Sequence, residues 1–191
     1  MRRPLVVGIS GASGAIYGIR LLEALRDHPD VATHLVVTKP AERTIAEETD
    51  WDLARVRALA SVVHPVGDIG AAIASGSFLT MGMVVAPCSI RTASAIASCQ
   101  ADNLLTRAAD VTLKESRKLV LVVRETPLHR GHLKVLLAAS ENGAVILPPM
   151  PAFYTAPQTI GEIVDHTVAR ILDQFAIPHA LSRRWGPQKT K

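Results

Sequence analysis

Short apolar segments alternate with longer amphipathic segments along this chain, and the alternation predicts an α/β fold. Five runs rich in Val, Ile and Leu predict strands at 5–9, 35–37, 83–86, 119–123 and 145–147. Their apolar residues are consecutive, which is typical of strands that are buried on both faces. A parallel sheet that is covered by helices on both sides provides such burial.

Helical periodicity fills the gaps between these runs and completes a βα rhythm. Helices are expected at 15–26, 41–48, 52–60, 92–98, 103–117, 131–140 and 160–175. The pattern predicts a three-layer, Rossmann-like α/β fold of the flavodoxin type, with a parallel sheet between two layers of helices. We expect a single domain over residues 1–191 with a C-terminal tail from about residue 178, because 191 residues suffice for one core but not for two.

Composition and charge exclude several classes of function. The chain has a formal net charge of +4, but its basic and acidic residues are interleaved and only 4% of residues are aromatic. Neither a basic stripe nor a base-stacking platform for nucleic acid is therefore expected. No apolar run approaches the roughly 18–20 residues that a membrane span needs. The first residues show no signal-peptide pattern, and we expect a cytoplasmic protein.

Two cysteines, Cys88 and Cys99, are too few for a disulfide framework or a four-cysteine zinc site. His129 and His132 have no carboxylate or cysteine neighbours at metal-binding spacing, which favours structural roles for both. We therefore expect no metal site.

A glycine-rich turn, GISGASGAIYG at residues 8–18, follows the first predicted strand. Glycines let the backbone approach a ligand, and the following helix N-terminus can bind a phosphate. The dinucleotide fingerprint lacks its first glycine, since Ile9 stands there, and Thr38 and Lys39 replace the acid that would bind a ribose. The Walker pattern is absent as well. A mononucleotide such as FMN is favoured, although a turn used only for packing also fits this segment.

The segment PCSIRT, residues 87–92, follows the third of these strands. Its hydroxyl groups, its arginine and a new helix N-terminus could hold the polar edge of an isoalloxazine ring. Cys88 could be a nucleophile, but no sequence signature pairs it with a base. We therefore interpret Cys88 as a small residue beside the ligand.

A charged helical face is expected between residues 107 and 118, where Arg107, Asp110 and Lys114 lie three or four residues apart. A solvated, salt-bridged surface explains this spacing by itself. The next strand, however, ends in Arg124 and Glu125. Cations beside an acid suit the departure of a phosphate leaving group, because the cations take up its charge and the acid can exchange a proton.

The proline-rich segment 148–154 ends in Tyr154 and could form the wall of a hydrocarbon pocket, or simply an exit turn. Farther on, Arg183, Arg184 and Trp185 combine cations with an aromatic ring. That combination suits packing on a neighbouring subunit, although a loose tail fits equally well.

Five segments together resemble the UbiX/Pad1 family of flavin prenyltransferases along nearly the whole chain: GISGASGAIYG, IASGSF, APCSIRT, DNLLTRAADVTLKESRKLVLVVRETPL and ILPPMPAFY. The resemblance implies a homododecamer with active sites between subunits. It implies reduced FMN and dimethylallyl monophosphate as substrates, joined at N5 and C6 of the flavin without a metal. The product, prenylated FMN, would serve a UbiD-type decarboxylase. Neither the pathway served nor a preference for monophosphate over diphosphate is indicated by the sequence.

The resemblance also implies roles for individual residues. The FMN contacts would be Gly11, Ala12, Ser13, Thr38, Ser89, Ile90, Arg91, Thr92 and Arg124. The prenyl-phosphate contacts would be Lys114, Glu125, Tyr154 and Arg170, with Ser75, Glu48, Arg107 and Trp185 as further pocket residues. Catalysis would fall to Ser13, Glu48, Lys114 and Glu125, with Glu125 and Ser13 handling protons. Thr38 stands where relatives usually have serine and Arg91 where many have lysine, so the hydroxyl and the charge are kept.

Two alternative functions remain open at this point. The first is FMN-dependent decarboxylation on the same scaffold. Cysteine decarboxylases of that kind carry a PASANT block and a histidine after the first helix, whereas this chain has APCSIRT and no histidine between Tyr17 and Arg26. The second is a flavin-carrier subunit of a decarboxylase system, without chemistry of its own.

Overall fold

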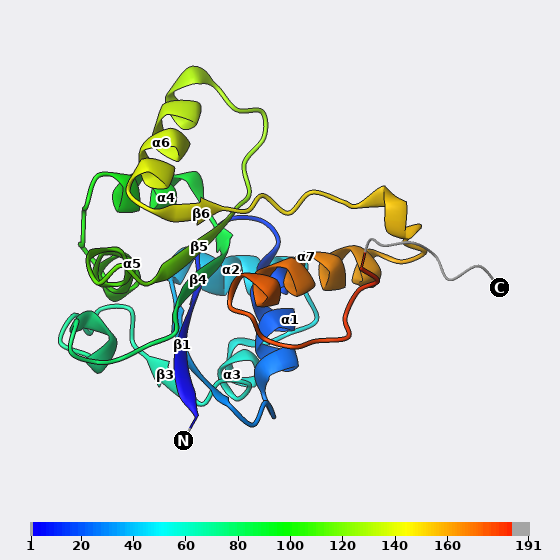
Figure 1. Ribbon diagram of the computed structural model, residues 1–191, viewed down its shortest axis with the longest axis horizontal. Coiled ribbons are helices and arrows are strands. Elements are labelled where there is room, and N and C mark those ends of the chain that lie inside the picture. Colours follow the sequence, from blue (N-terminus) through cyan, green and yellow to red (C-terminus); the bar gives the residue numbers. More distant parts are fainter. Residues whose placement is uncertain (1, 185–191) are drawn as a thin grey trace.

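A six-stranded parallel sheet forms the centre of the protein in the computed structural model, which describes residues 2–184 (Figure 1). The strands are β1 Arg3–Ile9, β2 Val31–Val37, β3 Val62–His64, β4 Gly82–Cys88, β5 Lys118–Val123 and β6 Ala144–Ile146. Their order is β3-β2-β1-β4-β5-β6, which is the Rossmann order. Without the edge strand β3, the remaining order is that of flavodoxin, so the predicted fold class is confirmed.

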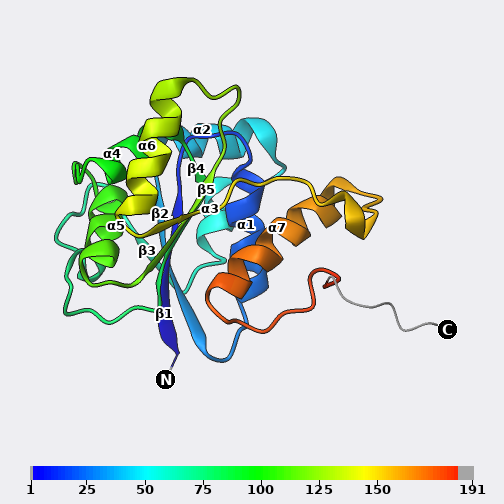
Figure 2. The ribbon, with the colours of Figure 1, turned by 45° about the horizontal axis from the view of Figure 1, so that its top comes forward.

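Helices cover both faces of the sheet (Figure 2). They are α1 Ala15–Leu25, α2 Lys39–Glu48, α3 Leu53–Arg57, α4 Ile90–Ala97, α5 Leu104–Lys114, α6 Arg130–Glu141 and α7 Ile160–Gln174, with short 3-10 turns η1 Ala72–Ala74 and η2 Phe153–Thr155. One core cluster joins the sheet to α1, α2, α3 and α7. A second cluster joins the opposite face to α4, α5 and α6. None of the helices within residues 2–184 is long and apolar enough to cross a bilayer.

Strand β1 shows why the apolar runs are continuous. Leu5, Val7 and Ile9 pack into the first core cluster, whereas Val6 belongs to the second. All four side chains are at most 1% exposed. Burial on both faces removes the selection for polar residues at alternate positions, as the sequence pattern indicated.

The structure differs from the predicted elements at several boundaries. Strand β3 was not predicted, because it has three residues at the sheet edge and two of them, Val62 and Val63, are about 40% exposed. Helix α2 begins at Lys39, two residues before the predicted start, since Pro40 is well tolerated in a first helical turn. Helix α5 ends at Lys114 instead of residue 117, and Ser116 then adopts a left-handed conformation with φ 54°.

The strand order reverses between β1 and β4, which are hydrogen-bonded neighbours at the middle of the sheet. The chain leaves β1 toward α1 on one face and leaves β4 toward α4 on the other. The two connections therefore diverge and leave a crevice beyond the carboxyl ends of these strands. Open α/β sheets bind their ligands at such a crevice.

Candidate functional site

A cleft of about 520 Å³ lies at this crevice. Its walls come from the segments that follow β1, β2, β3, β4 and β5. The lining residues are Gly11, Thr38, Lys39, Pro40, Val66, Ser89, Ile90, Arg91, Thr92, Ala95, Asp102, Asn103, Thr106 and Glu125. The structure thus brings six of the predicted FMN contacts and Glu125 together around one cavity.

Ser10 fixes the junction between the two central strands. Its hydroxyl group donates to the carbonyl oxygen of Pro87 at 3.0 Å and accepts the backbone N–H of Ser89 at 2.8 Å. Ser10 is 1% exposed, so these hydrogen bonds also satisfy polar groups that water cannot reach. The glycine turn and the PCSIRT segment are therefore held in one fixed relation.

The glycine turn passes very close to α2 and is supported by Glu48. A Cβ atom at Gly11 would lie 2.3 Å from Cβ of Pro40, so only glycine fits there without movement. Gly14 has φ 95°, a conformation that glycine adopts without strain. Its N–H donates to Oε2 of Glu48 at 2.7 Å. The family resemblance implied that Glu48 is a pocket residue. In the structure, Glu48 contacts the turn that also contains Ala12 and Ser13.

Three helices direct their N-termini toward the cleft. Thr38 caps α2, Ser89 caps α4 and Asn103 caps α5, and all three residues line the cavity. Helix N-termini carry partial positive charge and unpaired N–H groups, which favour anions. Lys39 and Arg91 add two full positive charges to the same wall. This part of the cleft therefore suits a phosphate group, while Asp102 and Glu125 add two negative charges elsewhere in the lining.

Arg124 and Glu125 follow directly after β5. The Arg124 N–H donates to the Cys88 carbonyl oxygen at 3.1 Å, which places Arg124 beside the end of β4. Burial raises the pKa of the Tyr17 hydroxyl, and the nearby positive charge of Arg124 acts in the opposite direction. The Arg124 side chain therefore lies near α1. Glu125 lines the cavity, and its carboxyl group accepts the Thr126 N–H at 3.2 Å.

Cys88 is fully buried in the second core cluster, and burial strongly raises the pKa of its thiol. A protonated, inaccessible thiol is a poor nucleophile. This finding argues against a nucleophilic role for Cys88. Its expected place beside the ligand stays a prediction, because Cys88 does not line the cleft. Within residues 2–184, no group of three or more His, Cys, Asp or Glu side chains is arranged to hold a metal ion.

Lys114 and Ser75 lie at the opposite edge of the sheet from Glu125. Lys114 ends α5 before β5 begins, whereas Glu125 follows the end of β5. A strand rises about 3.3 Å per residue, so the six residues of β5 separate the two edges by roughly 20 Å. At the far edge, Lys114 pairs with Glu115 beside Gly76, the neighbour of Ser75. Arg107 pairs with Asp110 at 2.8 Å, outside the cleft lining.

Tyr154 and Arg170 line a second cavity of about 520 Å³, between η2, α7 and the C-terminal segment. This cavity shares no lining residue with the cleft at the strand ends. Trp185, which was also expected in the prenyl-phosphate site, lies outside the described residues. Among the predicted prenyl-phosphate contacts, Glu125 therefore joins the predicted FMN contacts in the cleft, whereas Lys114, Tyr154 and Arg170 of the same chain lie elsewhere.

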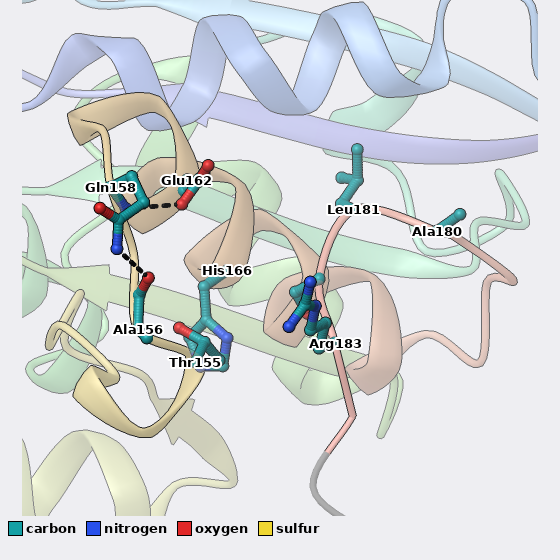
Figure 3. A pocket seen from close by; sticks show the side chains of 9 residues that line it. Thr155, Ala156, Gln158, Glu162, His166, Ala180, Leu181 and Arg183 are labelled. Atoms are coloured by element: carbon teal, nitrogen blue, oxygen red, sulfur yellow. Dashed lines mark hydrogen bonds between the residues drawn. The ribbon is translucent and has the colours of Figure 1, made fainter. Parts of the chain in front are cut away.

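A third hollow, of about 400 Å³, adjoins this cavity and shares His166, Ser182 and Arg183 with it (Figure 3). Its outer wall is formed by Gln158, whose backbone N–H donates to Glu162 at 2.7 Å and whose side-chain amide donates to the Ala156 carbonyl oxygen at 2.9 Å. His166 lies on the inner side, where its ring packs edge-on against Tyr154.

Sequence reasoning missed several residues of the site. Lys39 and Pro40 line the cleft and Ser10 supports it from behind, and all three lie directly after the first two strands, where the sequence pattern indicated no role for them. Asn103 and Thr106 form a capping box at the start of α5, a signal that the sequence does contain. Val66 comes from the loop after β3 and had no signal, because that strand was not predicted.

Comparison with known proteins identifies the family. The family model described as Flavoprotein matches residues 1–172. Flavin prenyltransferase UbiX of Escherichia coli (strain K12) is 59% identical over 183 residues, covering 95% of this chain and 97% of that protein.

Two solved structures are similar over nearly the whole chain. AnUbiX (PadA1), in complex with FMN and dimethylallyl pyrophosphate, matches with a TM-score of 0.96 and 48% identity, covering 99% of this chain and all of that chain. A dodecameric FMN-dependent UbiX-like decarboxylase from Escherichia coli O157:H7 matches with a TM-score of 0.94 and 52% identity, covering 96% and 100%. The chain therefore belongs to the Flavoprotein family and, within it, to the UbiX-type flavin prenyltransferases.

Proposed function

We propose that this flavin prenyltransferase joins the dimethylallyl group of dimethylallyl monophosphate to N5 and C6 of reduced FMN. The observation that supports the reaction best is the cleft at the strand switch point, where helix N-termini and cations meet the Glu125 carboxylate. The high identity to a curated flavin prenyltransferase over almost the full chain supports the same reaction. The product would be prenylated FMN, for use by a UbiD-type decarboxylase.

The residues at the strand ends fit FMN. The turn at Gly11, Ala12 and Ser13 would pass along the ligand, because Gly11 lines the cleft and presents only backbone there. Thr38, Ser89, Ile90, Arg91, Thr92 and Arg124 would hold the phosphate and the polar edge of the ring. When bound, reduced FMN supplies the electron-rich ring atoms to which the prenyl group is joined.

The chain's own carboxyl and hydroxyl groups would handle protons. Glu125 lines the cavity and is the proposed proton acceptor and donor, together with Ser13 on the glycine turn. Glu48 holds that turn through the Gly14 N–H and so keeps Ser13 in place. Positioned acids and bases of this kind accelerate reactions by about 10²–10⁴-fold.

The prenyl phosphate would be held by groups from more than one subunit. Lys114, Tyr154 and Arg170 are the proposed phosphate ligands, with Ser75, Arg107 and Trp185 nearby. Since one chain separates Lys114, Arg170 and Glu125 among different regions, a neighbouring copy has to complete the site. A homododecamer is proposed, and the dodecameric state of a 52% identical relative supports it. Fixed cations could stabilise the leaving phosphate without a metal.

Two broader properties complete the proposal. We treat residues 1–191 as one domain, because a single sheet passes through both core clusters. A cytoplasmic location is proposed because both cysteines are free thiols, which fits a reducing compartment.

Anaerobic incubation of the purified protein with reduced FMN and dimethylallyl monophosphate tests the reaction. Mass spectrometry of the flavin should show the addition of one dimethylallyl group. A Glu125→Gln variant should bind FMN normally and form the product at least about 100-fold more slowly. An unchanged flavin mass, with both ligands shown to bind, would contradict the prenyltransferase and favour a flavin carrier.

A further inference from the structure

The cavity that contains Tyr154 and Arg170 is unusually cationic. Besides these two residues, its wall includes Asp173, His179, Arg183 and Arg184. Three arginines thus face one carboxylate, which leaves an excess of two positive charges when the histidines are neutral. Burial, with the nearby charge of Arg170, lowers the pKa of His166 in the same wall despite the opposing charge of Asp173, so this ring favours its neutral form.

Asp173 connects the basic residues of this cavity. Its Oδ2 accepts from Nη1 of Arg170 at 2.7 Å, and its Oδ1 accepts from Nη2 of Arg184 at 2.7 Å. The same Oδ1 lies 3.1 Å from Nε2 of His179. The Asp173 side chain is 17% exposed and that of His179 is 5% exposed. One largely buried carboxylate therefore fixes Arg170 on α7 and also ties the C-terminal segment to this helix.

The cavity retains capacity for an anion. A guanidinium group has five N–H donors, and within the described part of the chain Asp173 engages only Nη1 of Arg170. The Nδ1 atoms of His166 and His179 are buried and have no hydrogen-bond partner among residues 2–184. Unpaired buried polar atoms are costly, so their presence beside three arginines points to a polar ligand.

We propose that Asp173 is a positioning residue that also determines donor specificity: it orients Arg170 and limits the positive charge of the cavity to match a prenyl monophosphate rather than a diphosphate. The inference rests on the proposed function. A phosphate monoester carries about −1.5 to −2 charge at neutral pH, which matches the excess of two positive charges that this chain contributes to the cavity. A diphosphate carries more negative charge, and the Asp173 carboxylate would repel the surplus.

Calorimetric titration of dimethylallyl monophosphate and dimethylallyl diphosphate into protein loaded with oxidised FMN measures the preference without turnover. The wild type should bind the monophosphate more tightly. Asp173→Asn removes one negative charge and should shift the ratio of the two dissociation constants toward the diphosphate by roughly tenfold. Arg184→Gln removes one positive charge and should shift the ratio in the opposite direction.

Asp165→Asn is the matched control, because Asp165 is also on α7 and pairs with an arginine, Arg20, at 2.6 Å outside the cavity. It should leave the ratio unchanged. General damage to the fold would weaken the binding of both prenyl phosphates to the same extent. Equal losses of affinity for the two ligands in the Asp173 and Arg184 variants would therefore overturn the inference. A wild-type preference for the diphosphate would overturn it as well. Failure of the wild type to bind either prenyl phosphate would instead overturn the proposed function.

Discussion

Individual side chains at the strand ends decide the shape of the proposed FMN cleft. Ser10 joins the ends of β1 and β4 through two hydrogen bonds, and Glu48 holds the N–H of Gly14 from the far end of α2. Neither residue lines the cavity itself, so both act by positioning the backbone of the segments that do. The geometry of the turn therefore depends on residues behind it as well as on its glycines.

Replacement of Glu48 by alanine should loosen the glycine turn. Loss of a hydrogen bond to a charged acceptor typically costs about 1.5–3 kcal/mol, so we expect FMN affinity to fall by about tenfold or more. Fluorescence titration with FMN measures this effect.

Glu47→Ala is the control for the Glu48 variant. Glu47 lies on the same helix and pairs only with exposed Arg43, four residues away, in the part of the chain that is described. Exposed pairs of this type contribute about 0.3–0.5 kcal/mol, so FMN affinity should be unchanged. Equal affinity losses in the two variants would mean that Glu48 does not support the turn.

At the scale of elements, close contact between the β1–α1 turn and α2 closes one side of the cleft. Gly11→Ala should weaken FMN binding and lower the melting temperature, because the new Cβ would meet Pro40 at 2.3 Å. Gly161→Ala is the control, since the nearest atom to a Cβ there, Oγ1 of Thr159, is 3.7 Å away. Unaltered FMN affinity in Gly11→Ala would show that the turn can move without harm.

The edge strand β3 is joined to β2 by a histidine pair. Nδ1 of His34 lies 3.0 Å from Nε2 of His64, and the two rings are stacked. Burial, followed by the charge of His64, lowers the pKa of His34. Burial also lowers the pKa of His64, while the charge of Asp68 opposes that shift. The folded protein therefore favours the neutral form of both rings.

This pair should make stability depend on pH. Histidines in the unfolded chain take up protons as the pH falls through about 6.5, whereas the folded pair resists protonation until lower pH. The melting temperature should therefore fall between pH 7.5 and pH 5.5. His64→Gln should reduce that fall, and His28→Gln, which leaves the pair intact, should not. An identical pH dependence in wild type and His64→Gln would exclude the pair as its source.

At the scale of the whole molecule, the proposed reaction needs groups that one chain holds apart. Lys114 lies at the amino edge of the sheet, Glu125 at the carboxyl edge, and Arg170 in a separate cavity on α7. The sheet is rigid and its strands are of fixed length, so no local movement closes this separation. Assembly of several copies can bring these groups together, because each copy can contribute a different one.

Mixed oligomers test whether the site is shared between subunits. Glu125→Gln and Arg170→Ala should each be inactive alone, and co-expression with two different tags should restore measurable flavin prenylation. Some sites in the mixed oligomer would combine intact Glu125 from one copy with intact Arg170 from another. Co-expression of Glu125→Gln with Ser13→Ala should restore nothing if both residues come from the same chain. Equal recovery in both mixtures would refute a shared site.

The sequence by itself determined the features that depend on local pattern. Consecutive apolar residues predicted five of the six strands. In β1, β2, β4 and β5 burial on both faces leaves no polar alternation, whereas β6 is only partly buried. The glycines at positions 11 and 14, the capping residues Thr38 and Ser89, and the pair Arg124 and Glu125 all follow strands directly. In a parallel sheet the carboxyl ends of strands meet at one edge, so the grouping of these residues could be predicted.

Only the tertiary structure decided which distant segments meet. Strand β3 is stabilised by pairing with β2 and not by its own partly exposed side chains, so its sequence gave no clear signal. Two contacts of Asp173 join α7 to His179 and Arg184, and the separation of Lys114 from Glu125 follows from the direction of β5. Such contacts depend on how elements pack in three dimensions, which hydrophobic periodicity along the chain does not specify.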